Sequence, residues 1–181
     1  MGCSQGTQMS VSQTSLDPRV PFNRTQLEDI RGFWWHVKRR FEDTAKEMLI
    51  RFFRHHPYFQ CLFKNLRDLK DEPAMRVSPE FEIHAMAVFA VIDDVIVNID
   101  GDVDVMLEKL EDVARIHART EGFHSEFFQY MEDAFIDALR EGLWERFTEN
   151  VEELFRKLFK WIEEALSLEV EAIEYRLIPG D

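Results

Sequence analysis

The sequence predicts an all-α protein, and three observations lead to this class. Apolar residues recur at helical spacing along most of the chain. Glycine and proline are few, with seven and six residues, which favours long helices over a turn-rich β fold. The 16 phenylalanines and 4 tryptophans are many for 181 residues, so they need a large core or a flat apolar ligand to pack against. About seven helices in one domain are expected from these patterns.

The N-terminal part of the chain is expected to be a flexible arm followed by two helices. Residues 1–24 are rich in Ser, Gln and Thr and show no periodicity. Thr25-Gln26-Leu27-Glu28 has the form of a capping box, which predicts a helix from residue 25 to about residue 40. A second helix is predicted from residue 42 to residue 55, because Pro57 disfavours helix in the residue before it.

The middle of the chain predicts a corner and two helices. Residues 57–78 are expected to be irregular, with Phe59, Leu62 and Phe63 as apolar anchors and Cys61 as a small hydrophobe among them. Ser78-Pro79 predicts a helix start, with Ser as the N-cap and Pro at the first helical position. Asp100-Gly101-Asp102 ends this helix, and a shorter helix follows that ends near residue 122.

The remaining helices and the domain limits follow from the same patterns. A helix is predicted over residues 125–139, and the last and longest helix over residues 145–168. Residues 177–181 read as an irregular end. The expected organisation is an arm over residues 1–24, one helical domain over residues 25–170 and a tail over residues 171–181.

Composition and charge exclude several classes of function. The formal net charge of −13 makes nucleic acid an improbable partner, because phosphate binding needs clustered Lys and Arg. Cys3 and Cys61 are too few for a disulfide framework, so a reducing intracellular setting is expected. No apolar run reaches membrane-spanning length, since Asp93 and Asp94 interrupt residues 85–99. Residues 1–24 lack the apolar centre of a secretory signal.

Two histidines are candidates for chemistry. His84 and His117 each interrupt an otherwise apolar stripe, and they belong to different predicted helices. Either ring alone is most simply a buried, hydrogen-bonded core histidine. As a pair on apolar walls, the rings are good ligands for iron held in a flat apolar macrocycle, because a neutral imidazole needs no counter-charge. A zinc motif of the form His-Glu-x-x-His is absent, and the single Glu121-x-x-His124 disfavours a di-iron site, which needs two such motifs.

From about Leu27 to Leu168 the chain resembles the globin family. Trp34 is similar to the tryptophan of the first globin helix, and residues 49–57 resemble the end of the second helix and its turn. Phe63 follows Pro57 by six residues and resembles the phenylalanine that globins stack on the haem. The span between His84 and His117 is a few residues longer than in muscle-type globins, and the acidic loop 100–104 takes up the excess. The resemblance implies a globin fold that encloses a haem b with its iron.

The resemblance also implies roles for individual residues. His117 corresponds to the proximal iron ligand, and His84 corresponds to the distal histidine, which in similar globins often ligates the iron directly. Ala87 stands where many globins place a cation near a haem propionate, which leaves Arg115, Arg119 and His124 as candidates for that contact. The haem-binding set implied by the resemblance is Leu49, Phe63, His84, Val88, Val113, His117 and Phe123.

The N-terminus carries a second signal. Met1-Gly2-Cys3 exposes Gly2 once Met1 is removed, so Gly2 is a candidate for myristoylation and Cys3 for palmitoylation. Two adjacent acyl chains give the stable attachment that one chain does not give. Gly6 departs from the usual Ser or Thr of the myristoylation pattern. The arrangement is similar to that of acylated, membrane-associated animal globins such as globin X and some nematode globins.

These features together predict a globin that binds oxygen and other diatomic gases in redox signalling or gas sensing. The acyl chains would hold it at the cytoplasmic face of the plasma membrane, where an electron donor would support haem redox activity on oxygen or nitrogen oxides. Two alternatives remain open. One is a soluble cytoplasmic globin for oxygen storage or transport, and the other is a haem-free helical interaction module.

Overall fold

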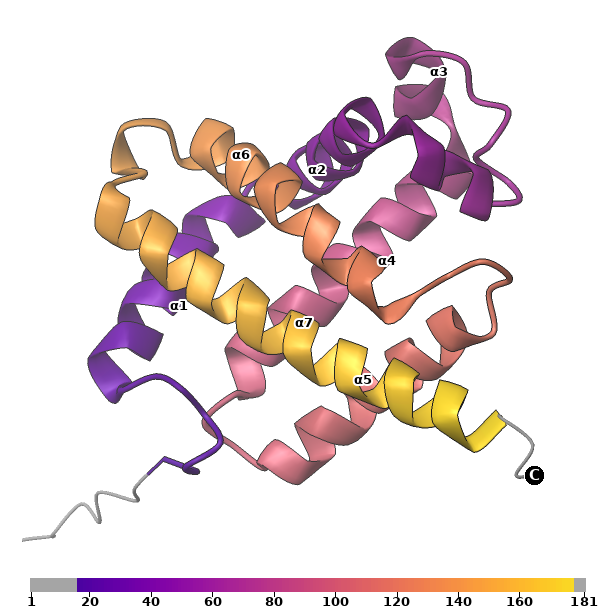
Figure 1. Ribbon diagram of the computed structural model, residues 1–181. Helices are drawn as coiled ribbons and strands as arrows, with labels where there is room; N and C mark the ends of the chain where they lie inside the picture. The colour runs from indigo at the N-terminus through magenta and orange to yellow at the C-terminus, as the bar shows by residue number, and fades with distance from the viewer. Residues whose placement is uncertain (1–15, 178–181) are drawn as a thin grey trace, which may run out of the picture.

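A computed structural model describes residues 16–177 and confirms the all-α class. Within this range the chain forms seven α-helices and three short 3-10 helices, and none of these residues is in a strand (Figure 1). The α-helices are α1 (Arg24–Lys38), α2 (Phe41–His55), α3 (Glu72–Val77), α4 (Pro79–Asn98), α5 (Val103–Ala118), α6 (Glu132–Leu143) and α7 (Glu149–Leu177). The 3-10 helices are η1 (Pro57–Leu62), η2 (Ser125–Met131) and η3 (Trp144–Arg146).

The first helix begins earlier than the sequence predicts. Asn23 is the N-cap, and its side chain accepts a hydrogen bond of 2.9 Å from the backbone N–H of Gln26. The Gln26 side chain in turn accepts a bond of 3.0 Å from the backbone N–H of Asn23, which completes a capping box. Asn23 and Thr25 both begin a stretch with the required pattern, and the prediction chose the wrong one of the two.

The segment before α1 packs on the domain, which differs from the expected arm over residues 1–24. Val20 and Phe22 are buried in the core. The carbonyl of Arg19 accepts a hydrogen bond of 2.9 Å from the indole N–H of Trp161 on α7. Two apolar side chains within a polar stretch give no periodic signal in the sequence. The Phe22 ring also meets α7, since the Lys157 ammonium group lies 5.1 Å from its centroid. The packed part of the chain therefore includes residues 16–24.

The corner between α2 and α4 is more regular than expected. It contains η1 and the six-residue helix α3, whose N-cap Asp71 accepts from the backbone N–H of Ala74. The Gln60 amide donates to the carbonyls of Leu66 and Leu69, at 2.7 and 2.8 Å, and so shapes the loop between them. A helix of this length shows too few turns for a periodic signal. Cys61 is exposed, so the expectation that it packs as a small hydrophobe is wrong.

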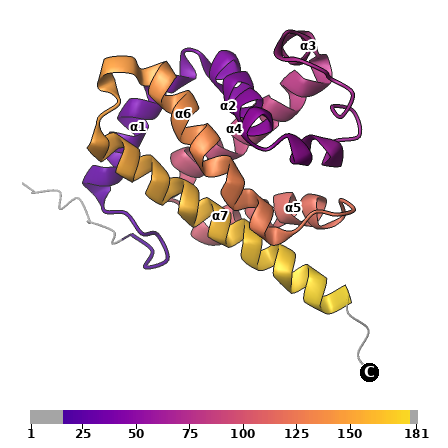
Figure 2. The ribbon, with the colours of Figure 1, turned by 45° about the horizontal axis from the view of Figure 1, so that its top comes forward.

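The C-terminal helices also differ from their predicted limits. The helix expected over residues 125–139 is divided into η2 and α6, and α6 continues to Leu143. Trp144 has a φ of 50°, and the chain turns at this residue. The first helical hydrogen bond of α7 then runs from the backbone N–H of Glu152 to the carbonyl of Thr148. The last helix is therefore α7, at Glu149–Leu177, and its last turns extend beyond the other helices (Figure 2). The expected tail over residues 171–181 is helical as far as residue 177.

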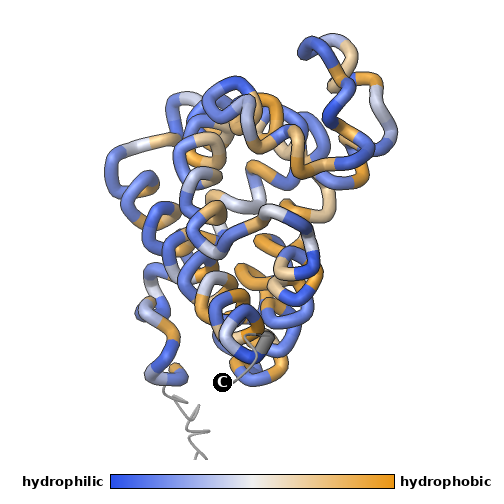
Figure 3. The backbone as a smooth tube through the Cα atoms, turned by 45° about the vertical axis from the view of Figure 1, so that its right-hand side comes forward, coloured by the Kyte–Doolittle hydropathy of each residue, from blue (hydrophilic) through white to orange (hydrophobic). Residues whose placement is uncertain are grey.

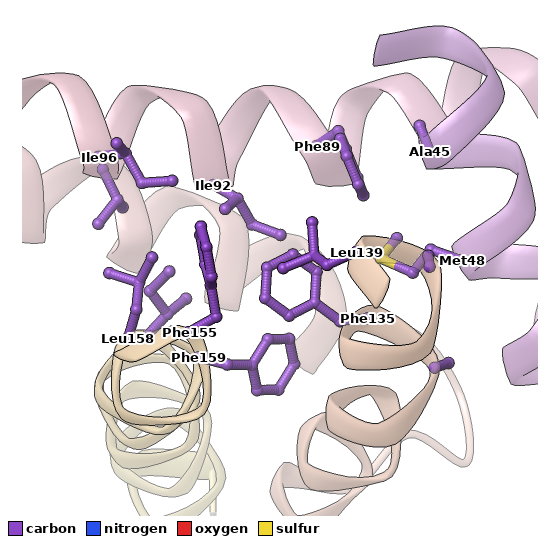
Figure 4. Packing of buried hydrophobic residues seen from close by; sticks show 14 of the residues in the cluster. Ala45, Met48, Phe89, Ile92, Ile96, Phe135, Leu139, Phe155, Leu158 and Phe159 are labelled. Carbon is purple, nitrogen blue, oxygen red and sulfur yellow. The ribbon is translucent and has the colours of Figure 1, made fainter. Parts of the chain in front are cut away.

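An aromatic core holds the long helices together. Trp34 of α1 packs its ring against Phe89 of α4 and Phe155 of α7, with centroids 5.5 and 6.2 Å apart. Phe135 of α6 contacts both Phe89 and Phe159 (Figure 4). With Trp34, side chains of α1, α4, α6 and α7 therefore meet in one cluster. Hydropathy alternates along each helix as its sides face the core or the surface (Figure 3). Among residues 16–177, no helix is long and apolar enough to cross a membrane.

Helix α4 is fixed near both ends, which sets the position of His84. Near its start, the buried Lys46 of α2 donates 2.6 Å to the Glu82 carboxylate. Near its end, Arg31 of α1 donates 3.0 Å to the Ile96 carbonyl and also forms two bonds to Asp100. The bond to Ile96, and another of 3.1 Å from Arg31 to the Val97 carbonyl, satisfy carbonyls that the last turn of a helix leaves without intrahelical partners. His84 therefore belongs to a helix that is held against α1 and α2.

Gly122, in the turn after α5, provides a test of local backbone energetics. Its φ is +80°, and a β-carbon there would lie 3.6 Å from Leu62 Cδ2, an ordinary contact. Replacing Gly122 with Ala should therefore lower the free energy of unfolding by about 1 kcal/mol through backbone strain alone. At Gly32, inside α1, a β-carbon would have nothing within 4 Å. Gly32→Ala should therefore raise the free energy of unfolding by about 0.5–1 kcal/mol. Urea unfolding of both variants checks the pair, and shifts of the same sign would contradict this account.

Candidate functional site

The two candidate histidines line one cavity of about 250 Å³. Its lining comes mainly from helices α4, α5 and α7 and from η1 and η2, and α2 contributes Phe52. Apolar side chains make up most of the lining, and eight of them are phenylalanine or methionine: Phe52, Phe59, Phe63, Phe123, Phe127, Phe128, Met131 and Phe159. The aromatic excess noted in the sequence therefore serves both the core and this cavity.

His117 is held in one orientation by its own helix. Its Nδ1 lies 2.9 Å from the backbone carbonyl of Val113, one turn earlier on α5. A carbonyl can only accept a hydrogen bond, so this contact assigns the proton to Nδ1 and leaves the Nε2 lone pair free. The ring also packs against Phe123 and Phe128, with centroids 5.0 Å away in each case. Burial lowers the pKa of His117, and the bond to Val113 opposes this in part.

His84 enters the same cavity from α4. Its ring meets Phe63 edge to face, with centroids 4.8 Å apart. Burial in the apolar cavity, together with repulsion from His117 when that ring is protonated, lowers the pKa of His84 to about 4. His84 forms no hydrogen bond with the part of the chain that the structure describes, so its ring nitrogens are available to a ligand. Both imidazoles are therefore neutral at physiological pH.

The cavity brings together nearly all of the haem-binding set that the resemblance implies. Leu49 is the exception, because it is fully buried in the core and does not line the cavity. Phe52, three residues later on α2, takes that place. The lining residues that match the expected haem-binding set are Phe63, His84, Val88, Val113, His117 and Phe123.

Several residues of the site were missed or remain unassigned. Phe127 and Phe128 line the cavity from η2, and their adjacent position in the sequence was the available signal. Arg115, a candidate for a propionate contact, instead pairs with Asp112 and Glu111 at 2.5 and 3.2 Å on its own helix. Neither Arg119 nor His124 lines the cavity.

The two histidines can serve as ligands to a metal whose remaining coordination positions are filled by a macrocycle. Within residues 16–177, no cluster of three or more His, Cys, Asp and Glu side chains could hold a bare metal ion. Two neutral imidazoles in an apolar cavity suit iron in a flat macrocycle, since the macrocycle fills the other coordination positions and packs against the aromatic walls. The residues present therefore fit a haem.

The sequence and the fold of this chain are both similar to those of known proteins. The globin family model matches residues 46–166. The chain is 27% identical to cytoglobin-2 of Oryzias latipes over 84% of this chain and 85% of the relative. It is 28% identical to cytoglobin-2 of Danio rerio over 76% of each chain. A solved hexacoordinated haem protein from an anhydrobiotic tardigrade superposes with a TM-score of 0.81 at 29% identity, over 86% of this chain and 99% of the other.

Proposed function

Because the chain belongs to the globin family, we propose that it binds one haem b in the cavity between α4 and α5. When bound, the haem supplies an iron that takes diatomic gases such as oxygen and exchanges single electrons. The single observation that carries the proposal is the pair of neutral, partly buried imidazoles that line one apolar cavity from two helices. A haem-free interaction module would have no use for this arrangement.

Each side of the cavity has a distinct task in this proposal. On the proximal side, His117 offers Nε2 to the iron while its bond to the Val113 carbonyl holds the ring and makes the nitrogen more basic. Phe63, against His84, and Phe123, against His117, line the cavity and would pack on the macrocycle and exclude water from it. On the distal side, His84 and Val88 lie one helical turn apart on α4, where they set the polarity and the space available to a gas.

His117→Ala tests the proximal assignment. The affinity of the variant for haem should fall by more than about 100-fold, which is the largest loss expected when only a hydrogen bond that supports a metal ligand is removed. Added imidazole should restore haem binding in part. Haem affinity is measured by absorption titration of the apoprotein. His55→Ala is the matched control, because His55 is exposed at the end of α2 and does not line the cavity. Retention of wild-type affinity and spectrum by His117→Ala would overturn the assignment.

We further propose that His84 ligates the iron directly when no gas is bound. The ring forms no hydrogen bond with residues 16–177, and the similar tardigrade protein is described as hexacoordinated. The ferrous, gas-free protein should therefore show a six-coordinate low-spin spectrum, and His84→Leu should convert it to a five-coordinate high-spin spectrum. A wild-type spectrum that is already five-coordinate and unchanged by His84→Leu would show that the direct bond is absent.

The physiological role that we propose is redox signalling or gas sensing at a membrane. Gly2 and Cys3 lie outside the described residues, so their acylation rests on the sequence alone. Residues 4–15 separate these positions from the first described residue, Leu16, which allows an acidic domain to stand off an anionic leaflet. Placement at the cytoplasmic face of the plasma membrane suits local electron transfer from a donor, or haem redox activity on oxygen or nitrogen oxides, and oxygen storage gains nothing from it.

Fractionation of animal cells that express the wild type, Gly2→Ala and Cys3→Ala tests this placement. The wild type should sediment with membranes, Gly2→Ala should be released, and Cys3→Ala should bind weakly because one acyl chain gives only reversible attachment. Incorporation of labelled myristate and palmitate identifies the two modifications. If the wild type is as soluble as Gly2→Ala, the anchor is wrong and storage or transport of oxygen in the cytoplasm becomes the favoured role.

A further inference from the structure

One charged side chain lines the cavity and has no part in the assignments above. Glu163 of α7 is 8% exposed, and it is the single carboxylate among the described lining residues. Its neighbours on the same side of α7, Ile162 and Leu166, also line the cavity. Helix α7 crosses and contacts α5, the helix that carries His117 (Figure 1). A carboxylate therefore belongs to a wall next to the proximal helix, in a cavity whose other lining residues are mostly apolar.

Hydrogen bonds fix the position of this carboxylate. Its Oε2 accepts a bond of 2.6 Å from the Lys160 ammonium group, and its Oε1 lies 3.1 Å from the Ser167 hydroxyl. The Ser167 hydroxyl also lies 3.1 Å from the carbonyl of Ser125 in η2, the segment whose Phe128 packs on the His117 ring. Lys160 is itself 56% exposed, so water screens its charge more than that of the Glu163 carboxylate, whose side chain is 9% exposed.

A fixed buried charge acts on any redox centre in the cavity. Reduction of a ferric haem adds one electron and no proton, so the iron carries one positive charge less in the ferrous state. A nearby carboxylate stabilises the ferric state more than the ferrous state, and screening is weak where water is excluded. We propose that Glu163 shifts the one-electron equilibrium of the haem toward the ferric form. This inference rests on the proposed haem binding.

The structure indicates how to remove the charge while keeping the contacts. The Ser167 hydroxyl has one hydrogen and cannot donate to both Ser125 and Glu163. A glutamine at position 163 can accept from Lys160 through its oxygen and donate to Ser167 through its nitrogen, which frees Ser167 to donate to Ser125. Glu163→Gln is therefore close to isosteric and satisfies every bond. Glu163→Leu removes the charge in a second way, and Glu163→Asp retains it.

The test is a spectroelectrochemical titration of the haem-loaded full chain, with an external one-electron mediator. At a fixed applied potential, Glu163→Gln and Glu163→Leu should each raise the ratio of ferrous to ferric haem by about threefold or more relative to the wild type. Glu163→Asp should stay near the wild type. Glu164→Gln is the matched control, because it removes the same charge from the adjacent residue, whose side chain is 59% exposed, and it should change the ratio little.

The possible failures are distinguishable. Equal ratios for the wild type and Glu163→Gln, with haem bound in both, would overturn the role of Glu163 alone. A shift in Glu164→Gln as large as that in Glu163→Gln would show a general surface-charge effect and would also overturn it. A wild-type chain that takes up no haem would overturn the proposed function and this inference with it.

Discussion

The site depends on keeping two imidazole rings neutral and correctly oriented inside an apolar cavity. Burial opposes the charged form of both rings, so each ring keeps a lone pair for a metal. The bond from His117 Nδ1 to the Val113 carbonyl then decides which nitrogen of that ring carries the proton. This constraint explains the aromatic lining, because water that entered the cavity would solvate the rings and compete for the same lone pairs.

The rest of the fold places the two rings on separate rigid elements. Helix α4 carries His84 and is held to α2 through Lys46 and to α1 through Arg31. Helix α5 carries His117 and contacts α7. The cluster around Phe135 of α6 joins α4 to α7 through Phe89 and Phe155 (Figure 4). The cavity wall therefore continues into the core through Phe159, which contacts Phe135 and also lines the cavity.

Features with a local cause could be predicted from the sequence, and features set by tertiary contacts could not. Ser78-Pro79 marks the start of α4 because both residues act within the first turn, and the structure confirms it. His84 and His117 were identifiable because each interrupts an apolar stripe. The predicted lining included Leu49, which lies in the core, and omitted Phe52, which lines the cavity. Helical periodicity does not tell which apolar side chain faces a cavity and which faces the core. Glu163 gave no signal, because it sits in a helix with many carboxylates and only its burial distinguishes it.

Titration of the apoprotein with haem, followed by absorption spectroscopy, tests the central claim most directly. The account predicts that one haem per chain saturates the protein and gives a spectrum with a nitrogenous axial ligand to the iron. Uptake without saturation, or no uptake by a folded chain, would contradict the claim that the two imidazoles and the apolar cavity form a haem site.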